Sequence, residues 1–277
     1  MTWRRAVVAL IALGLALLAW SYATAIADPV VRRAEVSLPG LDRPVRVVLI
    51  ADIHVAGPDM PPERLGRIVG QINALRPDVV LIAGDFIGDG RLSTGVPADE
   101  AIHPLSALRS SFGSFAVLGN HDHWNDAAAV RAALSRAGIR LLVNDAVAAG
   151  PLAIGGLDDA YTDHHDLSRT LARMRALAGG RILLSHSPDP FPGVPGDVSL
   201  MLAGHTHCGQ IRLPLIGAIS TMSEHGDRYA CGRIDEGGRT LIVSAGLGTS
   251  ILPLRLGAVP DLWLIELRPG PARSPPR

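Results

Sequence analysis

The sequence predicts one α/β domain preceded by a single hydrophobic N-terminal helix. Three observations lead to this prediction. An uncharged stretch of 22 residues lies near the start of the chain at Ala6–Ala27, short apolar runs then alternate with helical patterns, and several of those runs end in Asp, His or Asn. The chain has 277 residues, of which 48% are hydrophobic and 19% charged, so a sizeable core is available and intrinsic disorder is excluded.

The charge balance excludes several classes of protein. The chain carries 26 basic and 26 acidic side chains and no net charge at pH 7. Because no broad basic field is present, no binding of a nucleic acid scaffold is expected. All the basic residues are arginine. Mechanisms that need a Schiff-base lysine or a P-loop lysine are therefore excluded.

The stretch Ala6–Ala27 is long enough to cross the ~30 Å hydrocarbon core of a bilayer as a helix. Trp3, Trp20 and Tyr22 lie near its ends, where aromatic residues anchor membrane helices. Residues 1–28 are therefore predicted to form a transmembrane anchor or a signal segment.

Two interpretations of residues 1–28 stay open. As an uncleaved anchor, the segment makes a single-pass protein of the cell (inner) membrane with an extracytoplasmic catalytic domain. As a signal peptide, it is cleaved at a small-x-small site such as Ala23-Thr24-Ala25, and the mature protein is periplasmic or secreted. Two arginines precede the segment and two follow it closely, so the charge pattern favours export only weakly.

Cys208 and Cys231 are the only cysteines. In an oxidising compartment they can form a disulfide that closes a loop of about 24 residues. In the cytosol two free thiols are the default, and the sequence leaves both alternatives open.

Short apolar runs indicate buried strands. After a linker or edge strand at 29–44, with a turn at Pro39-Gly40, these runs are Val45–Ala51, Val79–Ala83, Phe115–Leu118, Leu152–Ile154, Ile182–Leu184, Ser199–Leu202, Leu241–Ser244 and Leu262–Leu267. Helical spacing is found at Pro61–Leu75, Asn125–Ala137 and Asp166–Ala178. This alternation predicts one domain at 45–268, followed by a disordered tail at 269–277.

Five of the predicted strands end in metal-binding side chains. The segments are Asp52-Ile53-His54, Gly84-Asp85, Gly119-Asn120-His121-Asp122, Ser185-His186 and Gly204-His205-Thr206-His207. Sites in α/β sheets form beyond the carboxyl ends of the strands, where such residues converge. One His or Asp at a strand end is usually a surface or turn residue, but burying this many together without a metal is costly. The pattern therefore predicts a metal centre.

In this order, Asp-x-His, Gly-Asp, Gly-Asn-His-Asp, a lone His and Gly-His-x-His resemble the calcineurin-like metallophosphoesterases over residues 45–210. The continuation from Gly204, together with Arg228-Tyr229 and residues 246–250, is similar to a bacterial branch of that family with an N-terminal membrane or export segment. The resemblance implies a four-layer α/β/β/α sandwich behind the hydrophobic helix.

Carried over position by position, the resemblance implies a site for two divalent metal ions. One ion would be bound by Asp52, His54 and His207, the other by Asn120, His186 and His205, and Asp85 would bridge them. These nitrogen and oxygen ligands suit Mn, Zn or Fe. The ions would polarise the phosphoryl group and activate a water for in-line attack.

The resemblance also implies that His121 is the catalytic residue that protonates the leaving oxygen or stabilises charge there. In much of the family a second Asp or Asn, three residues after the Gly-Asp aspartate, orients this histidine. Here that position is Gly88. Either Asp89 or Asp122 would then take over the role, or His121 would be held less firmly.

Other polar residues are less informative. Asp158-Asp159 and His164-His165 are interpreted as exposed loop residues, with substrate contact as the alternative. Arg212 and Arg228 are of the type that clamps a phosphate with two hydrogen bonds.

The resulting hypothesis is a membrane-associated phosphodiesterase or pyrophosphatase. Its substrate would be a phosphoester small molecule, or a lipid-linked or nucleotide-type compound such as a UDP-diacylglucosamine-like pyrophosphate. A phosphomonoesterase is the alternative enzyme, because the same two-metal machinery serves both reactions. A non-catalytic metal-binding scaffold on the same fold is the alternative outside enzymes. Such a scaffold would be expected to have lost ligands or the acid, and all of them are present here.

Overall fold

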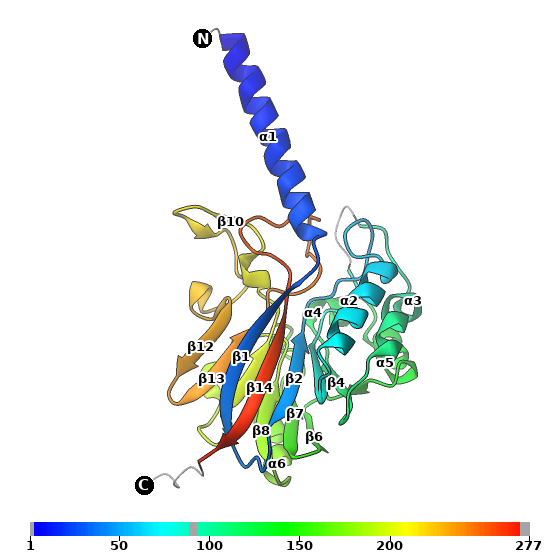
Figure 1. Ribbon diagram of the computed structural model, residues 1–277, viewed down its shortest axis with the longest axis vertical. Helices are drawn as coiled ribbons and strands as arrows, with labels where there is room; N and C mark the ends of the chain where they lie inside the picture. The colour runs from blue at the N-terminus through cyan, green and yellow to red at the C-terminus, as the bar shows by residue number, and fades with distance from the viewer. Residues whose placement is uncertain (1–2, 89–92, 272–277) are drawn as a thin grey trace.

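The computed structural model describes residues 3–88 and 93–271. A helix of 23 residues, α1 (Trp3–Ala25), stands out from a body that contains two β-sheets (Figure 1). By length and composition α1 can cross a membrane, and only 6% of its most apolar 18-residue window is buried. The predicted hydrophobic N-terminal helix is confirmed.

The first sheet has six strands in the order β1-β14-β2-β3-β4-β5. Their bounds are β1 (Val30–Pro39), β14 (Asp261–Gly270), β2 (Val45–Ile50), β3 (Val79–Ala83), β4 (Ser114–Val117) and β5 (Arg140–Leu141). The edge strand β1 pairs in parallel with β14, and β14 is antiparallel to β2. Strands β2 to β5 are parallel, so their carboxyl ends meet at one end of the sheet.

The second sheet also has six strands, in the order β12-β13-β9-β8-β7-β6. Their bounds are β12 (Gly232–Glu236), β13 (Arg239–Val243), β9 (Leu200–Ala203), β8 (Gly180–Leu184), β7 (Leu152–Gly156) and β6 (Asp145–Ala149). The four central strands are parallel, and the two outer strands β12 and β6 are antiparallel to their neighbours.

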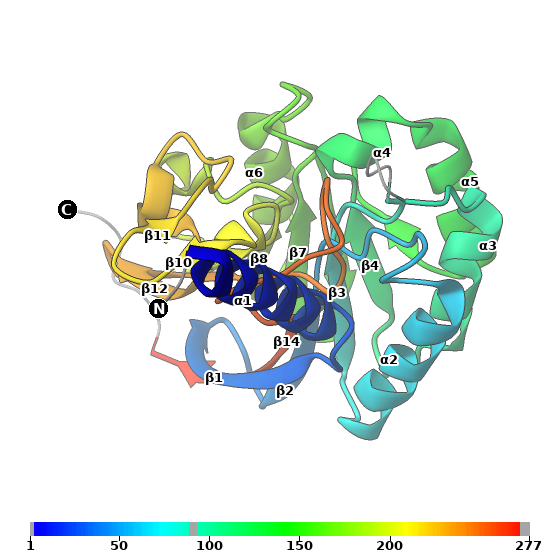
Figure 2. The ribbon, with the colours of Figure 1, turned by 90° about the horizontal axis from the view of Figure 1, so that it is seen from above.

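Helices cover the outer faces of both sheets. Their bounds are α2 (Pro62–Ala74), α3 (Ala98–Ile102), α4 (Asn120–Trp124), α5 (Ala127–Arg136) and α6 (Leu167–Arg175), with 3₁₀ turns η1 (His103–Ala107), η2 (Phe191–Gly193), η3 (His207–Gly209) and η4 (Gly226–Tyr229). Figure 2 shows α2, α3 and α5 on one flank of the body. A short hairpin, β10 (Arg212–Leu213) and β11 (Gly217–Ala218), stands apart from both sheets.

Three apolar clusters define the layers. The first lies between the two sheets and includes Val47, Leu81 and Ile182. The second joins the outer face of the first sheet to α2, α3 and α5, and the third joins the outer face of the second sheet to α6. The predicted four-layer α/β/β/α sandwich is therefore confirmed.

The eight predicted strands and three predicted helices are present with small shifts at their ends. The N-terminal cap of α5 is Asp126, whose carboxylate accepts the Ala129 N–H at 2.9 Å. The tail predicted to start at 269 is wrong for its first two residues. Pro269 and Gly270 pair with the end of β1 and thereby extend β14.

Sequence patterns missed the elements with few apolar residues. In β12 half-buried residues alternate with exposed ones, and β10 and β11 contain two residues each. Edge strands of this kind carry too little apolar signal to be recognised by pattern alone.

The carboxyl end of α1 is attached to the body. Ser21 and Ala25 are its two buried residues. The Ser21 carbonyl accepts the backbone N–H of Arg255 at 3.0 Å, and the Ala27 carbonyl accepts a hydrogen bond from the buried Arg64 guanidinium at 2.6 Å. The helix therefore leaves the body at a fixed point.

Candidate metal centre

The seven predicted ligands lie together beyond the carboxyl ends of strands from both sheets. Asp52 and His54 follow β2, Asp85 follows β3, Asn120 follows β4, His186 follows β8, and His205 and His207 follow β9. Each is at most 6% exposed. Strand order thus brings residues that are far apart in the chain to one buried place.

The first group contains Asp52, His54 and His207, whose nearest ligand atoms all lie within 4.8 Å of one another. The Nε2 atoms of His54 and His207 are 3.2 Å apart. His207 Nε2 is also 3.5 Å from Asp52 Oδ1. These three side chains face a common centre, as metal ligands do.

The second group contains Asn120, His186 and His205. His186 Nε2 lies 3.0 Å from Asn120 Oδ1 and 3.1 Å from His205 Nδ1. Asp85 stands between the two groups, because its Oδ2 atom is 3.4 Å from His54 Nε2 and 3.3 Å from His186 Nε2.

Backbone carbonyls orient two of the imidazoles. His186 Nδ1 donates to the Ala83 carbonyl at 2.7 Å, and His205 Nε2 donates to the Met222 carbonyl at 3.0 Å. In this tautomer the other nitrogen of each ring offers a lone pair to the site, as in metal-binding histidines. His54 Nδ1 is buried and has no hydrogen-bond partner among the described residues.

The donor set suits a cation. With those tautomers, His186 Nε2, His205 Nδ1, Asn120 Oδ1 and Asp85 Oδ2 are all electron-pair donors that face one another. A buried cluster of acceptors without a shared donor is unfavourable unless a positive charge lies among them. The residues therefore fit divalent metal ions, and the mixture of imidazole and oxygen ligands agrees with a borderline metal.

The pKa values support this conclusion. Burial lowers the pKa of His54 to about 3 and that of His205 to about 4, so these imidazoles are neutral at pH 7. Burial also lowers the pKa of His186, but the Asp85 carboxylate outweighs burial and raises it well above the usual value. The rise shows that a positive charge is favoured next to Asp85.

Five of the seven side chains leave the backbone from a left-handed conformation. These residues are Asp52, His54, Asp85, His205 and His207, with φ angles between 47° and 71°. Non-glycine residues rarely adopt this region, and such strain concentrates at functional sites. Hydrogen bonds between neighbouring loops also hold this conformation, since the His205 N–H donates to both Asp52 carboxylate oxygens at 3.0 Å.

Two of the glycines allow close approach rather than unusual torsion angles. A Cβ atom on Gly119 would collide with the Asp85 carboxylate, and one on Gly204 would collide with the Asp52 carboxylate. Glycine is therefore required at both strand ends, because the carboxylates lie directly against the backbone.

His121 lies at the edge of the buried cluster. Its N–H donates to Asp85 Oδ1 at 3.0 Å, and its Nε2 atom is 3.3 Å from the Ser250 hydroxyl. The imidazole meets the His54 ring edge-on, with ring centroids 4.8 Å apart. The side chain is half-buried and lines the cleft described below, so it can reach a bound substrate.

Asp122 has other partners than the His121 imidazole. Its carboxylate accepts the backbone N–H groups of Asp85, Phe86 and Gly119, each at 2.9 Å. Burial raises its pKa to about 7, with a further contribution from the Asp85 carboxylate. Asp122 thus joins the loops after β3 and β4. Asp89, the other residue expected to orient His121, lies outside the described residues.

Arg255 is a site residue that the sequence analysis missed. It is fully buried and donates to the carbonyl oxygens of Ala245, Gly246 and Gly248. Its Nη2 atom lies 3.4 Å from His207 Nδ1. Burial lowers its pKa to about 10, so the guanidinium stays charged at pH 7. The only signal in the sequence is one arginine inside an apolar stretch.

The interpretation of Asp158 and Asp159 as exposed loop residues is wrong, since they are 4% and 0% exposed. The reason is local pairing. Asp158 Oδ1 lies 2.9 Å from His123 Nε2, and the His123 ring stacks on His164 with centroids 4.0 Å apart.

Arg212 and Arg228 are engaged by protein groups. Arg212 donates to the Cys208 carbonyl at 3.1 Å, and Arg228 donates to Glu236 at 2.8 Å. Nothing in these contacts supports a role as a phosphate clamp.

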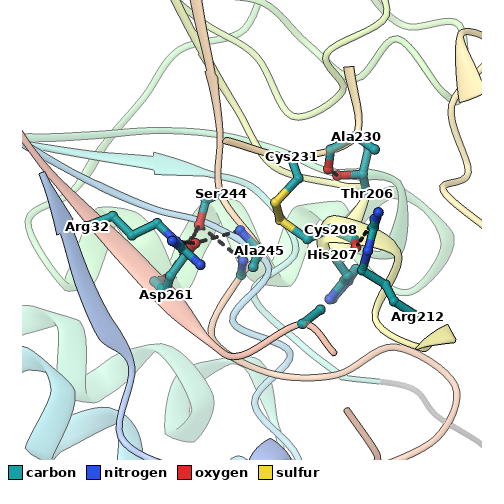
Figure 3. Close-up of a disulfide and its surroundings, with 12 residues drawn as sticks. Arg32, Thr206, His207, Cys208, Arg212, Ala230, Cys231, Ser244, Ala245 and Asp261 are labelled. Carbon is teal, nitrogen blue, oxygen red and sulfur yellow. Dashed lines mark hydrogen bonds and ion pairs between the residues drawn. A yellow bond between two sulfur atoms is a disulfide. The ribbon is translucent and has the colours of Figure 1, made fainter. Parts of the chain in front are cut away.

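A disulfide joins Cys208, which follows His207, to Cys231, which precedes β12 (Figure 3). Next to it, the Thr206 hydroxyl donates to the Ala230 carbonyl at 2.6 Å. Of the two alternatives left open by the sequence, pairing is the one observed. The bond attaches the ligand-bearing loop after β9 to the edge of the second sheet.

A cleft of about 410 Å³ opens above the buried cluster. Asp85, Asn120, His205 and His207 form its polar floor. Its walls are largely apolar and include Trp124, Ile211, Ile219, Met222, Ile251 and Leu252. The cavity therefore combines a candidate metal centre with room for an apolar group.

Comparison with known proteins identifies the family to which the sequence is similar. The model of the calcineurin-like phosphoesterases matches residues 45–209. The uncharacterized metallophosphoesterase YkuE of Bacillus subtilis is 32% identical over 80% of this chain and 79% of its own length. An uncharacterized metallophosphoesterase of Campylobacter jejuni is 30% identical over 94% of this chain and 68% of its own. A transmembrane protein with a metallophosphoesterase domain from Danio rerio is 32% identical over 84% of this chain and 54% of its own.

Proposed function

The chain belongs to the calcineurin-like phosphoesterase family, and we propose that it is a phosphodiesterase or pyrophosphatase that hydrolyses a P–O bond with two divalent metal ions. The observation that carries this proposal is the position of Asp85. Its Oδ2 atom lies 3.4 Å from one group of candidate ligands and 3.3 Å from the other, as a bridging carboxylate requires.

In this proposal Asp52, His54 and His207 would hold one ion, Asn120, His186 and His205 would hold the other, and Asp85 would contribute to both. When bound, two such ions polarise a phosphoryl oxygen and lower the pKa of water. The chain's own contribution is preorganisation. The carbonyls of Ala83 and Met222 fix the imidazoles of His186 and His205 in the tautomer that binds.

His121 acts as the general acid in this proposal. It lines the cleft at the edge of the ligand cluster, with its Nε2 atom 3.3 Å from the Ser250 hydroxyl. A proton at Nε2 can be donated to the leaving oxygen of a phosphoester held over the metal centre. The Asp122 carboxylate supports this arrangement indirectly, because it holds the loops that carry Asp85 and His121.

The substrate is proposed to be an amphiphilic phosphoester, such as a lipid-linked pyrophosphate of the UDP-diacylglucosamine type. Two observations support this class. The cleft has apolar walls that a charged nucleotide alone would leave unused, and α1 is long and apolar enough to hold the site at a bilayer.

We further propose that residues 1–28 are a membrane anchor and that residues 45–268 form the catalytic domain on the extracytoplasmic side of the inner membrane. The disulfide supports this side, because disulfides persist in oxidising compartments.

The test is hydrolysis of a chromogenic phosphodiester beside the matching monoester, with Mn or Zn restored after chelation. Preference for the diester is expected. Preference for the monoester indicates the phosphomonoesterase alternative, and no turnover at full metal occupancy indicates a non-catalytic scaffold. Asn120→Ala and His121→Ala should both abolish turnover, but only Asn120→Ala should lower metal occupancy. Equal metal loss in both variants would refute this division of roles.

A further inference from the structure

We propose that an apolar rim beside the cleft docks onto the surface of the bilayer. The rim consists of Leu215, Ile216, Ile219 and Met222 from the β10–β11 hairpin and the segment after it, and of Ile251 and Leu252 from the loop that follows β13. Figure 1 shows the hairpin and this loop at the end of the body from which α1 leaves.

The apolar side chains of the rim are more exposed than is favourable on a surface that faces water. Leu215 is fully exposed, and Ile216, Ile219 and Ile251 are 72%, 65% and 59% exposed. Single exposed apolar residues are ordinary, whereas an apolar patch on the described body marks an interaction surface.

The backbone of the rim supports the same conclusion. Leu215 and Ile251 both hold a φ angle of 66°, a region that β-branched and bulky residues avoid. This strain is not offset by burial inside the protein, since Leu215 and Ile251 are both exposed. Contact with a partner would supply the missing stabilisation.

The position of α1 identifies that partner as a bilayer. The backbone N–H of Arg255, in the same loop as Ile251, donates to the Ser21 carbonyl in the last turns of α1 at 3.0 Å. Trp20 and Tyr22, on either side of Ser21, are the aromatic residues that mark a membrane–water boundary. The loop therefore lies at the depth where a spanning α1 would leave the lipid.

The two halves of the rim form one unit. The Gln210 side chain donates to the carbonyls of Ser250 and Leu252 at 3.0 and 3.2 Å and accepts the Ser250 N–H at 2.9 Å. The hairpin is thereby fixed to the loop that contacts α1. If the loop lies at the membrane boundary, the hairpin tip lies there too.

Docking has a consequence for catalysis, which rests on the proposed function. Ile219, Met222, Ile251 and Leu252 belong both to the rim and to the wall of the cleft. A rim immersed in the boundary between headgroups and acyl chains opens the cleft directly onto that boundary. A phosphoester with acyl chains would then reach the metal centre without leaving the bilayer.

The experiment measures depth and needs no turnover. The full chain is prepared as Leu215→Cys, Ile251→Cys or the control Ala148→Cys. Ala148 is an exposed residue near the β6–β7 turn, at the far end of the second sheet. Both native cysteines are bonded to each other, so an environment-sensitive fluorophore attaches only to the new thiol. Each protein is reconstituted in phosphatidylcholine–phosphatidylglycerol vesicles.

At positions 215 and 251 we expect iodide quenching to be reduced about threefold or more relative to position 148, together with quenching by shallow spin-labelled lipids. Equal iodide quenching at all three positions overturns the proposal, and so does protection of one loop alone. Protection from iodide without quenching by spin-labelled lipids indicates a protein cover, such as a second copy, and also overturns it. A catalytically dead chain that shows the expected pattern would refute the proposed function and leave docking intact.

Discussion

The two sheets contribute differently to the same site. Loops after the first sheet carry both candidate carboxylate ligands, the amide ligand, one imidazole ligand (His54) and His121, whereas the second sheet supplies imidazole ligands alone, at His186, His205 and His207. Negative charge is thus concentrated on one half of the molecule. The other half supplies imidazoles, two of which backbone carbonyls orient.

The sheets also differ in how they are supported. Among the described residues, the cluster between the first sheet and its helices contains 24 buried hydrophobic residues, against 12 on the outer side of the second sheet. The second half instead has a covalent bond, Cys208–Cys231, beside its ligands. The difference indicates that packing positions the first half of the site, while the disulfide supports the second.

The largest effect is expected where the two halves meet. Asp85→Asn keeps the size of the side chain but removes the charge between the two ligand groups. We expect activity to fall by about 10³-fold or more, with loss of bound metal. The measurements are turnover of a phosphodiester and metal content by mass spectrometry.

The matched control for that change is Asp99→Asn, because Asp99 is exposed and pairs with Arg136. It should retain activity and metal. If Asp85→Asn keeps both metals, Asp85 does not bridge the two groups.

The second effect concerns the loop that crosses from β13 in the second sheet to β14 in the first sheet. Arg255→Met removes the guanidinium that holds the carbonyls of Ala245, Gly246 and Gly248 in the crossing from β13 to β14. The free energy of unfolding in detergent should fall by about 3 kcal/mol or more, because buried acceptors lose their donor. Arg255→Lys should restore only part of the lost free energy of unfolding, because an ammonium group cannot donate to several carbonyls with the geometry of a planar guanidinium.

Arg67→Met is the control for Arg255→Met, because Arg67 is exposed on α2. It should leave urea unfolding unchanged. Equal shifts for both arginine variants would mean that Arg255 has no special structural role.

A third effect tests the covalent support of the second half. The double change Cys208→Ser and Cys231→Ser should lower the free energy of unfolding by about 2–4 kcal/mol, because the unfolded chain regains the freedom of the closed loop. Metal affinity should fall as well, since Cys208 adjoins His207. Urea unfolding and metal titration measure the two losses.

A reducing agent should shift the wild-type chain toward the double variant and leave the double variant itself unchanged. If the variant unfolds like the oxidised wild type, packing alone supports the second half, and the contrast between the sheets fails.

The smallest effect is expected at the N-terminal caps of two helices, one packed on each sheet. Asp126 caps α5 over the first sheet and Asp166 caps α6 over the second, each by accepting a backbone N–H, at 2.9 and 2.8 Å. Substitution by Ala should cost about 1 kcal/mol in each case. If the thinner outer layer of the second sheet is the weaker part, Asp166→Ala should also speed hydrogen exchange in β7 and β8, without a matching effect of Asp126→Ala in β3. Uniform exchange in both variants would contradict that view.

Local patterns in the sequence were sufficient to predict the buried central strands of both sheets and the polar residues that follow them, but not the outer strands β5, β6 and β12. Apolar runs such as Val79–Ala83 show burial directly, and the Asp and His residues that follow them are adjacent in the chain. Arg255 could not be found in this way, because its environment is formed by carbonyls that only the folded loop brings together. The burial of Asp158 likewise depends on His123, which lies on a different segment. Left-handed backbone at the ligands also has no sequence signature, since residues other than glycine occupy it.

The pairing of strand β1 limits when the first sheet can form during synthesis. It follows α1 directly, yet its partner is β14. Residues 30–39 therefore cannot pair in the sheet until residues 261–270 have been synthesised. Until the last strand is available, β1 is an unpaired edge next to the helix, and β2 lacks the neighbour that separates it from β1. Closure between such distant segments is slow and leaves strand edges exposed in the meantime. The body therefore cannot complete its first sheet segment by segment as the chain emerges. The sheet is completed only when residues 261–270 have been synthesised and pair with residues 30–39 and 45–49.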